Sequence, residues 1–114
     1  MMSMTNLSRR AFFQHLLSPS PKRRYWPISL SDAATTRHTH AVVTGTVTYV
    51  RKMADGDYHL TLDDGTTRLV CEIIPAIPLP PPRKGQRVRV WGITRQDRHH
   101  GWPEIHPIER LDVL

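Results

Sequence analysis

The chain has 114 residues, a formal net charge of +6 and a sequence pI of about 10.2. This length predicts one domain with a single modest core. The single cysteine, Cys71, excludes an internal disulfide and a zinc site built from several cysteines, and no stretch approaches the roughly 20 apolar residues of a membrane-spanning helix.

The basic excess is concentrated near the N-terminus. Residues 1–40 contain six lysines and arginines against one aspartate, whereas residues 41–114 contain ten against nine acidic side chains. The composition also changes at residue 41, where a run of β-branched residues begins. These shifts predict a basic, mostly irregular N-terminal arm over residues 1–40 and an all-β domain over residues 41–114.

The arm contains one short stretch with helical character. Residues 7–17 (LSRRAFFQHLL) place Ala11, Phe12, His15 and Leu16 near one face, and Ser8 is suited to cap the N-terminus. The SRRAFF sequence is similar to a twin-arginine export signal, but QHLLSPSPKRR follows where export requires an apolar region. We therefore expect a cytoplasmic protein whose arm orders only against a partner or against its own domain.

Three short strands are predicted in the first half of the domain. Residues 41–51 (AVVTGTVTYVR) are rich in valine and threonine, and residues 58–64 (YHLTLDD) alternate between apolar and polar side chains. The dipeptide Asp64-Gly65 is a hairpin turn signal. The turn leads into a third strand over residues 66–74 (TTRLVCEII).

Two further strands are predicted in the second half. Residues 75–85 (PAIPLPPPRKG) contain five prolines and cannot lie within a sheet. Residues 86–95 (QRVRVWGITR) alternate again, and residues 103–114 (PEIHPIERLDVL) form the last strand, with a bulge expected at Pro107. Five short strands separated by glycine and proline, with no long helix, predict a small all-β barrel.

The order of these strands resembles the oligonucleotide/oligosaccharide-binding fold, or OB-fold. Gly45 stands in the middle of a long first strand, which must bend in such a barrel. The stretch KGQRVRVWG (84–92) is similar to the entry of the fourth strand of that fold. The resemblance covers residues 41–114 and implies a five-stranded OB-like Greek-key barrel.

A second resemblance concerns two short motifs. DGDYH (55–59) and HGWPEIHP (100–107) look like the D-G-D-x-H and H-G-x-x-E-[IL]-H-P motifs of a group of small bacterial OB-fold proteins with no assigned chemistry. The resemblance supports the fold and implies no particular activity. Many members of that group are secreted, whereas a secretory leader is not recognisable in this sequence.

The same motifs contain the side chains that a metal or catalytic site would use. His59, Glu104 and His106 offer ligands for zinc, but the third strand is expected to separate the first of them from the other two by roughly 9–10 Å. A histidine base oriented by a carboxylate is a further alternative. Cys71 lies in an apolar run and is expected in the core rather than as a nucleophile. We therefore expect no enzyme activity, no metal and no cofactor. The polar side chains of the two motifs are expected to form hydrogen bonds at the ends of strands.

A basic strip with an indole is the stronger functional signal. On the predicted fourth strand, Arg87, Arg89 and Trp91 share one face, opposite Val88 and Val90. Guanidinium groups suit phosphates, and an aromatic ring suits a stacked base. The sequence therefore predicts a non-catalytic module that binds single-stranded DNA or RNA. Further contacts are expected from other basic residues of the barrel and the arm, namely Lys84, Arg95, Arg9, Arg10, Arg23 and Arg24.

Two alternatives stay open. Arg87 and Arg89 equally suit a solvated outer face, with Trp91 packed under the proline segment or the arm. The second functional hypothesis is a protein-docking accessory subunit of a larger complex, anchored by its N-terminal arm. Residues 75–83 (PAIPLPPPR) would add a polyproline surface for the aromatic groove of a partner.

Overall fold

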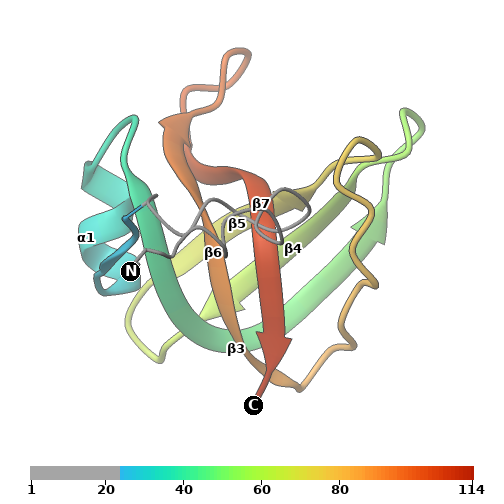
Figure 1. The fold of residues 1–114 in the computed structure, drawn as a ribbon, viewed down its shortest axis with the longest axis horizontal. Coiled ribbons are helices and arrows are strands. Elements are labelled where there is room, and N and C mark those ends of the chain that lie inside the picture. The colour runs from blue at the N-terminus through green and yellow to red at the C-terminus, as the bar shows by residue number, and fades with distance from the viewer. Residues whose placement is uncertain (1–23) are drawn as a thin grey trace, which may run out of the picture.

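The computed structural model describes residues 24–114, which are drawn in colour in Figure 1. The helix expected over residues 7–17 lies outside this range, as do Arg9, Arg10 and Arg23, so what was expected of them stays a prediction. Among the described residues, no helix is long and apolar enough to cross a membrane.

Five long strands form a closed barrel. They are β3 (His40–Lys52), β4 (Tyr58–Asp63), β5 (Arg68–Ile73), β6 (Arg87–Gln96) and β7 (Pro103–Val113). Neighbours follow the order β3-β4-β5-β7-β6, and β6 pairs again with β3. All pairs are antiparallel except β5 with β7. The expected OB-like Greek-key barrel is confirmed, and each strand begins and ends within two residues of its predicted bounds.

The first long strand, β3, bends sharply and serves both halves of the barrel (Figure 1). Its N-terminal half pairs with β6 and its C-terminal half with β4, and the two pairings meet at Thr46. Gly45 lies at this bend. A Cβ atom there would approach Leu30 Cδ1 at 3.2 Å and the backbone oxygen of Asp63 at 3.3 Å. The glycine therefore makes room for the chain to turn against its neighbours.

The second half of the expected arm packs onto the barrel. The short strand β2 (Trp26–Pro27) lies parallel to the start of β3, and helix α1 (Leu30–Thr35) follows it. The side chain of Ser29 caps α1 by accepting a backbone hydrogen bond. Leu30 and Ala33 are each only 1% exposed and belong to the core. The packed structure therefore begins N-terminal to the change in composition at residue 41.

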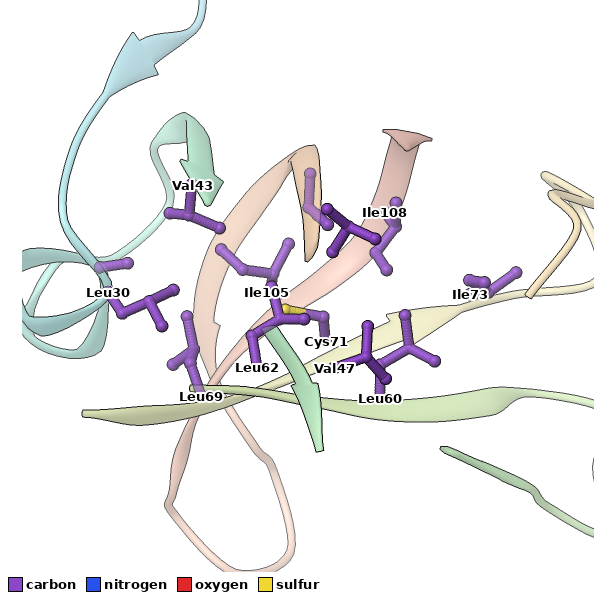
Figure 2. Packing of buried hydrophobic residues seen from close by; sticks show 13 residues of the cluster. Leu30, Val43, Val47, Leu60, Leu62, Leu69, Cys71, Ile73, Ile105 and Ile108 are labelled. Atoms are coloured by element: carbon purple, nitrogen blue, oxygen red, sulfur yellow. The ribbon is translucent and has the colours of Figure 1, made fainter. Parts of the chain in front are cut away.

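Apolar side chains from all five barrel strands and from α1 fill the interior (Figure 2). Alternation along each strand decides which side chains are buried: in β6, Val88 and Val90 are buried, whereas Arg87 and Arg89 are exposed. Burying one such side chain contributes about 1.5–3 kcal/mol relative to leaving it exposed. The cluster consists of Leu30, Ala33, Val43, Val47, Leu60, Leu62, Leu69, Cys71, Ile73, Val88, Val90, Ile105 and Ile108.

Two irregular features of the barrel agree with the sequence-based expectations. Residues 75–86, which include the five prolines, form no strand. The register between β6 and β7 slips where a bulge was expected. Thr94 lies opposite Ile105, but Gly92 lies opposite Ile108, so β7 contains one extra residue over this stretch.

Candidate functional site

The outer face of β6 carries the basic strip that the sequence indicated. Arg87 and Arg89 are exposed and Trp91 is half-buried, all on the side of the strand opposite the core. The guanidinium group of Arg110, on the neighbouring strand β7, lies over the Trp91 ring at 4.4 Å from its centroid. This cation–π contact covers part of the indole. Arg110 is also ion-paired with Asp112, with 2.9 Å between Nη2 and Oδ2, so it adds little net charge to the strip.

A shallow groove of about 750 Å³ runs beside this strip. Arg89 and Trp91 form one side, and most of the rest comes from β2, α1, β3 and the residues between β2 and α1. Two carboxylates also line it, Asp32 from α1 and Asp64 from the turn after β4. A second hollow of about 370 Å³ includes Arg87 and shares Thr44 and Asp64 with the first. The two hollows therefore make one continuous surface along the outer face of β3 and β6, which we call the β3–β6 groove.

The remaining predicted contact residues are spread out. Lys84 is exposed in the turn before β6. Arg24 lies over the ring of Trp26, with its Cζ atom 5.5 Å from the ring centroid. Arg95, at the far end of β6, faces other partners: its Nε atom lies 3.6 Å from Glu104 Oε2. The basic strip of the described residues is consequently shorter than the sequence indicated. Arg110 flanks it from β7 but is paired with Asp112.

A second cluster lies on the outer face of β4, β5 and β7, and its centre is Glu72. The Glu72 Oε1 atom lies 3.4 Å from His59 Nε2 and 3.5 Å from His106 Nε2. The sequence indicated that one strand separates these histidines, and β5 does lie between β4 and β7. The prediction missed that β5 itself supplies the bridging carboxylate.

Glu104 adjoins Glu72 from β7. Glu104 is only 2% exposed, and its Oε1 atom has no hydrogen-bond partner among the described residues. Burial, reinforced by the neighbouring Glu72 carboxyl, raises the pKa of Glu104 to about 8. Burial is also the main cause that raises the pKa of Glu72. Because this pKa lies above 7, Glu104 holds a proton at neutral pH even though the Arg95 guanidinium lies 3.6 Å from its Oε2 atom.

Arg95 links this cluster to the end of β6. Its Nη1 atom lies 3.2 Å from His106 Nδ1, and because a guanidinium only donates, that ring nitrogen must accept. The proton of a neutral His106 ring is thereby assigned to Nε2, the atom that faces Glu72. We call His59, Glu72, Glu104 and His106 the β4–β5–β7 cluster.

Cys71 and the β6–β7 loop are structural. The Cys71 side chain is fully buried, and burial raises the pKa of its thiol. In the loop, Asp97 Oδ2 accepts backbone hydrogen bonds from His99 and His100 and lies 3.0 Å from His100 Nδ1. The His100 ring stacks on Trp102 with 4.2 Å between centroids. These residues hold the loop closed at the rim of the barrel.

The fold matches solved structures at low sequence identity. An asparaginyl-tRNA synthetase from Pyrococcus horikoshii aligns with a TM-score of 0.66 and 16% identity, over 76% of this chain and 22% of that chain. The telomere capping protein Ten1 from S. pombe aligns with a TM-score of 0.56 and 20% identity, over 75% and 79%. The E. coli protein ygiW aligns with a TM-score of 0.57 and 12% identity, over 82% and 94%.

These matches are similarities of fold. No protein-family model matches the sequence, and no curated protein matches it. The chain spans 22% of the Pyrococcus synthetase, so it corresponds to one part of that enzyme. The resemblance to the OB-fold is thereby confirmed, whereas the resemblance to the small bacterial group stays a prediction.

Proposed function

We propose that this protein is a non-catalytic module that binds single-stranded DNA or RNA in the β3–β6 groove. One observation carries the proposal: Arg87, Arg89 and Trp91 lie on one outer face, beside a continuous groove. Phosphates would contact the guanidinium groups, and a base would stack on the exposed part of the Trp91–Arg110 pair.

Charge favours this face over the one that OB-folds commonly use. That common face is formed by the second and third barrel strands, here β4 and β5. Residues 55–72, which include both strands in large part, contain five acidic side chains against one arginine. Residues 83–98 contain six lysines and arginines against one aspartate. The basic residues in and before β6 therefore attract a polyanion. The carboxylates of Asp32, Asp63 and Asp64 also line the groove, so phosphates are expected on its Arg87 and Arg89 side.

The test is the binding of a fluorescent single-stranded oligonucleotide across a salt series, with the full chain in EDTA. Each phosphate that a protein neutralises on a single strand contributes about 0.7 to the slope of log K against log salt. The Arg87→Ala/Arg89→Ala variant should therefore weaken binding and reduce the slope by about 1.4.

The matched control is Arg51→Ala/Arg98→Ala. It removes the same charge from two exposed positions outside the groove and should keep more of the slope. Absence of binding by the wild-type chain at low salt contradicts the proposal. So does an equal loss of slope in the two double variants, because binding would then depend on net charge alone.

Docking in a larger complex is the second candidate. One structural match is a chain of the Stn1–Ten1 complex of S. pombe, at a TM-score of 0.60 and 17% identity. In this chain Trp26 is 52% exposed on β2, where the N-terminal arm joins the barrel. A pull-down that compares the full chain with a chain lacking residues 1–23 and with Trp26→Ala tests this candidate. An unchanged set of partners in both variants would exclude docking through the arm.

A further inference from the structure

We propose that Asp57, His59 and Glu72 form a binding site for a divalent first-row transition-metal ion on the outer face of β4 and β5. One ligand atom from each of the three side chains lies within 4.8 Å of the other two. His59 and Glu72 are directly opposite each other on adjacent strands, and Asp57 precedes β4 in the turn after β3. The proposal does not depend on nucleic-acid binding. That function is proposed for the basic side chains of β6, whereas this site consists of a histidine and two carboxylates at β4 and β5.

The donor set decides the class of ion. One imidazole nitrogen and two carboxylate oxygens suit zinc, iron(II) or manganese, whereas calcium and magnesium prefer oxygen ligands alone. The turn that presents Asp57 is fixed, because its backbone N–H donates to Asp55 Oδ1 at 3.0 Å. Only small side-chain movements are needed to bring the three donors around one ion.

The buried carboxyl of Glu104 is an independent sign that a cation belongs here. Its Oε1 atom is buried and has no hydrogen-bond donor among the described residues, and its carboxyl lies against that of Glu72. Arg95 lies 3.6 Å from the other oxygen, Oε2, and Oε1 stays without a partner. A cation on the adjoining Glu72 would compensate this buried oxygen.

His106 fits the role of a positioning residue and not of a ligand. Its Nδ1 atom faces Arg95, which leaves the proton on Nε2, and Nε2 lies 3.5 Å from Glu72 Oε1. An imidazole that orients a ligating carboxylate in this way is a frequent outer partner of metal sites. The side chain of His59 is 29% exposed, so an ion can enter from solvent. Three protein ligands leave a position for water.

Cobalt and zinc titrations of the full chain, stripped with EDTA and then dialysed, test the site. We expect one equivalent of Co²⁺ to bind with a visible absorption band, and one equivalent of Zn²⁺ to displace it. Removing an outer partner of a metal commonly weakens binding by roughly 10–100-fold. His59→Ala and Asp57→Asn remove direct ligands and should weaken binding by at least that factor.

The control is His38→Ala, since His38 and His40 form an unrelated His-x-His pair that could bind metal adventitiously. This variant should keep the wild-type affinity. Asp57 is in a turn and only partly buried, so Asp57→Asn should fold even if a change at the buried Glu72 does not. Melting of every variant in EDTA verifies folding. The proposal is overturned if the wild-type chain binds neither ion at one equivalent, or if Asp57→Asn and His59→Ala bind as tightly as wild type.

Discussion

His59 and Glu72 face each other across the β4–β5 pair, with 3.4 Å between His59 Nε2 and Glu72 Oε1. The pairing places an ionisable carboxylate that is only 6% exposed between two imidazole rings, because His106 approaches the same oxygen from β7. A charged group in such a position is stable only when its neighbours compensate it. The outer face of this barrel therefore contains a buried polar network. The fold itself does not require one, because the outer face of a small barrel can simply be exposed to solvent.

The first prediction concerns the pH dependence of stability in EDTA. In the folded chain the pKa of Glu104 is raised to about 8 from an ordinary value of 4.5, chiefly by burial. Between these values the folded state keeps a proton that the unfolded state has released. The contribution of Glu104 to the free energy of unfolding is therefore at its maximum below pH 4.5 and decreases as the pH rises toward 8.

Thermal melting of the wild-type chain and of Glu104→Gln between these pH values measures the effect. Glutamine cannot ionise, so the decline should become shallower in the variant, although the raised pKa of Glu72 contributes a decline of the same sign. A variant that loses stability with pH as steeply as wild type would show that Glu104 is not the proton-holding group.

The second prediction tests whether α1 belongs to the folded unit. Leu30 is 1% exposed and lies within the core, whereas Ser31 is exposed on the same helix. Leu30→Ala should lower the free energy of unfolding by about 2–5 kcal/mol, the usual cost of emptying a buried leucine site. Urea unfolding measures it, with Ser31→Ala as a control that should change little. A loss below about 0.5 kcal/mol would contradict the assignment of α1 to the core.

Much of the barrel was predictable because its signals are local. Alternation marked β4 and β6, β-branched composition marked β3, proline excluded residues 75–85 from the sheet, and Gly45 marked the bend of β3. The central pair of the cluster needs one fact more than the turn signal. A two-residue turn at Asp64-Gly65 would set His59 opposite Val70, whereas the ladder ends at Asp63 and Arg68, so the connection spans residues 64–67 and sets His59 opposite Glu72.

The rest depends on contacts between distant segments, which a pattern in one strand does not contain. Arg95 shares the alternation of the basic strip, yet it interacts with Glu104 and His106 across the β6–β7 pair. Arg110 covers Trp91 from another strand. The packing of α1 onto the core likewise depends on contacts of Leu30 and Ala33 with side chains of the barrel strands, which the sequence of the helix alone does not reveal.

The third prediction concerns Gly92 at the β6–β7 bulge. A Cβ atom at this position would lie 2.5 Å from the backbone oxygen of Pro107 and would also overlap the side chain of Ile105. Since neither the backbone nor a fully buried isoleucine yields easily, Gly92→Ala should cost about 1–3 kcal/mol. Gly45→Ala is the comparison, because its nearest contacts are 3.2 Å or longer and its cost should be smaller. Equal stability of the two variants in urea unfolding would contradict this reasoning.

The fourth prediction is that Cys71 does not react in the native state. The thiol is fully buried, and burial raises its pKa, so almost no thiolate forms at neutral pH. The native chain should not react with a thiol reagent such as DTNB within minutes, and the urea-unfolded chain should react at once. Cys71→Ser should lower the free energy of unfolding by about 1–3 kcal/mol because it buries a hydroxyl group. Rapid labelling of the native chain would argue against a core position.

The fifth prediction separates stacking from charge in the β3–β6 groove. Trp91 faces the groove beside Arg89, whereas Trp26, the control, is more exposed and does not line it. If a base stacks on Trp91, Trp91→Ala should weaken oligonucleotide binding by about 1–3 kcal/mol and leave the salt slope unchanged, because no phosphate contact is lost. Trp26→Ala should leave both quantities near wild type. A loss of affinity that is greatest at low salt, with a salt slope reduced by about 0.7, would show that the indole only supports the packing of Arg110. The proposed stacking would then be wrong.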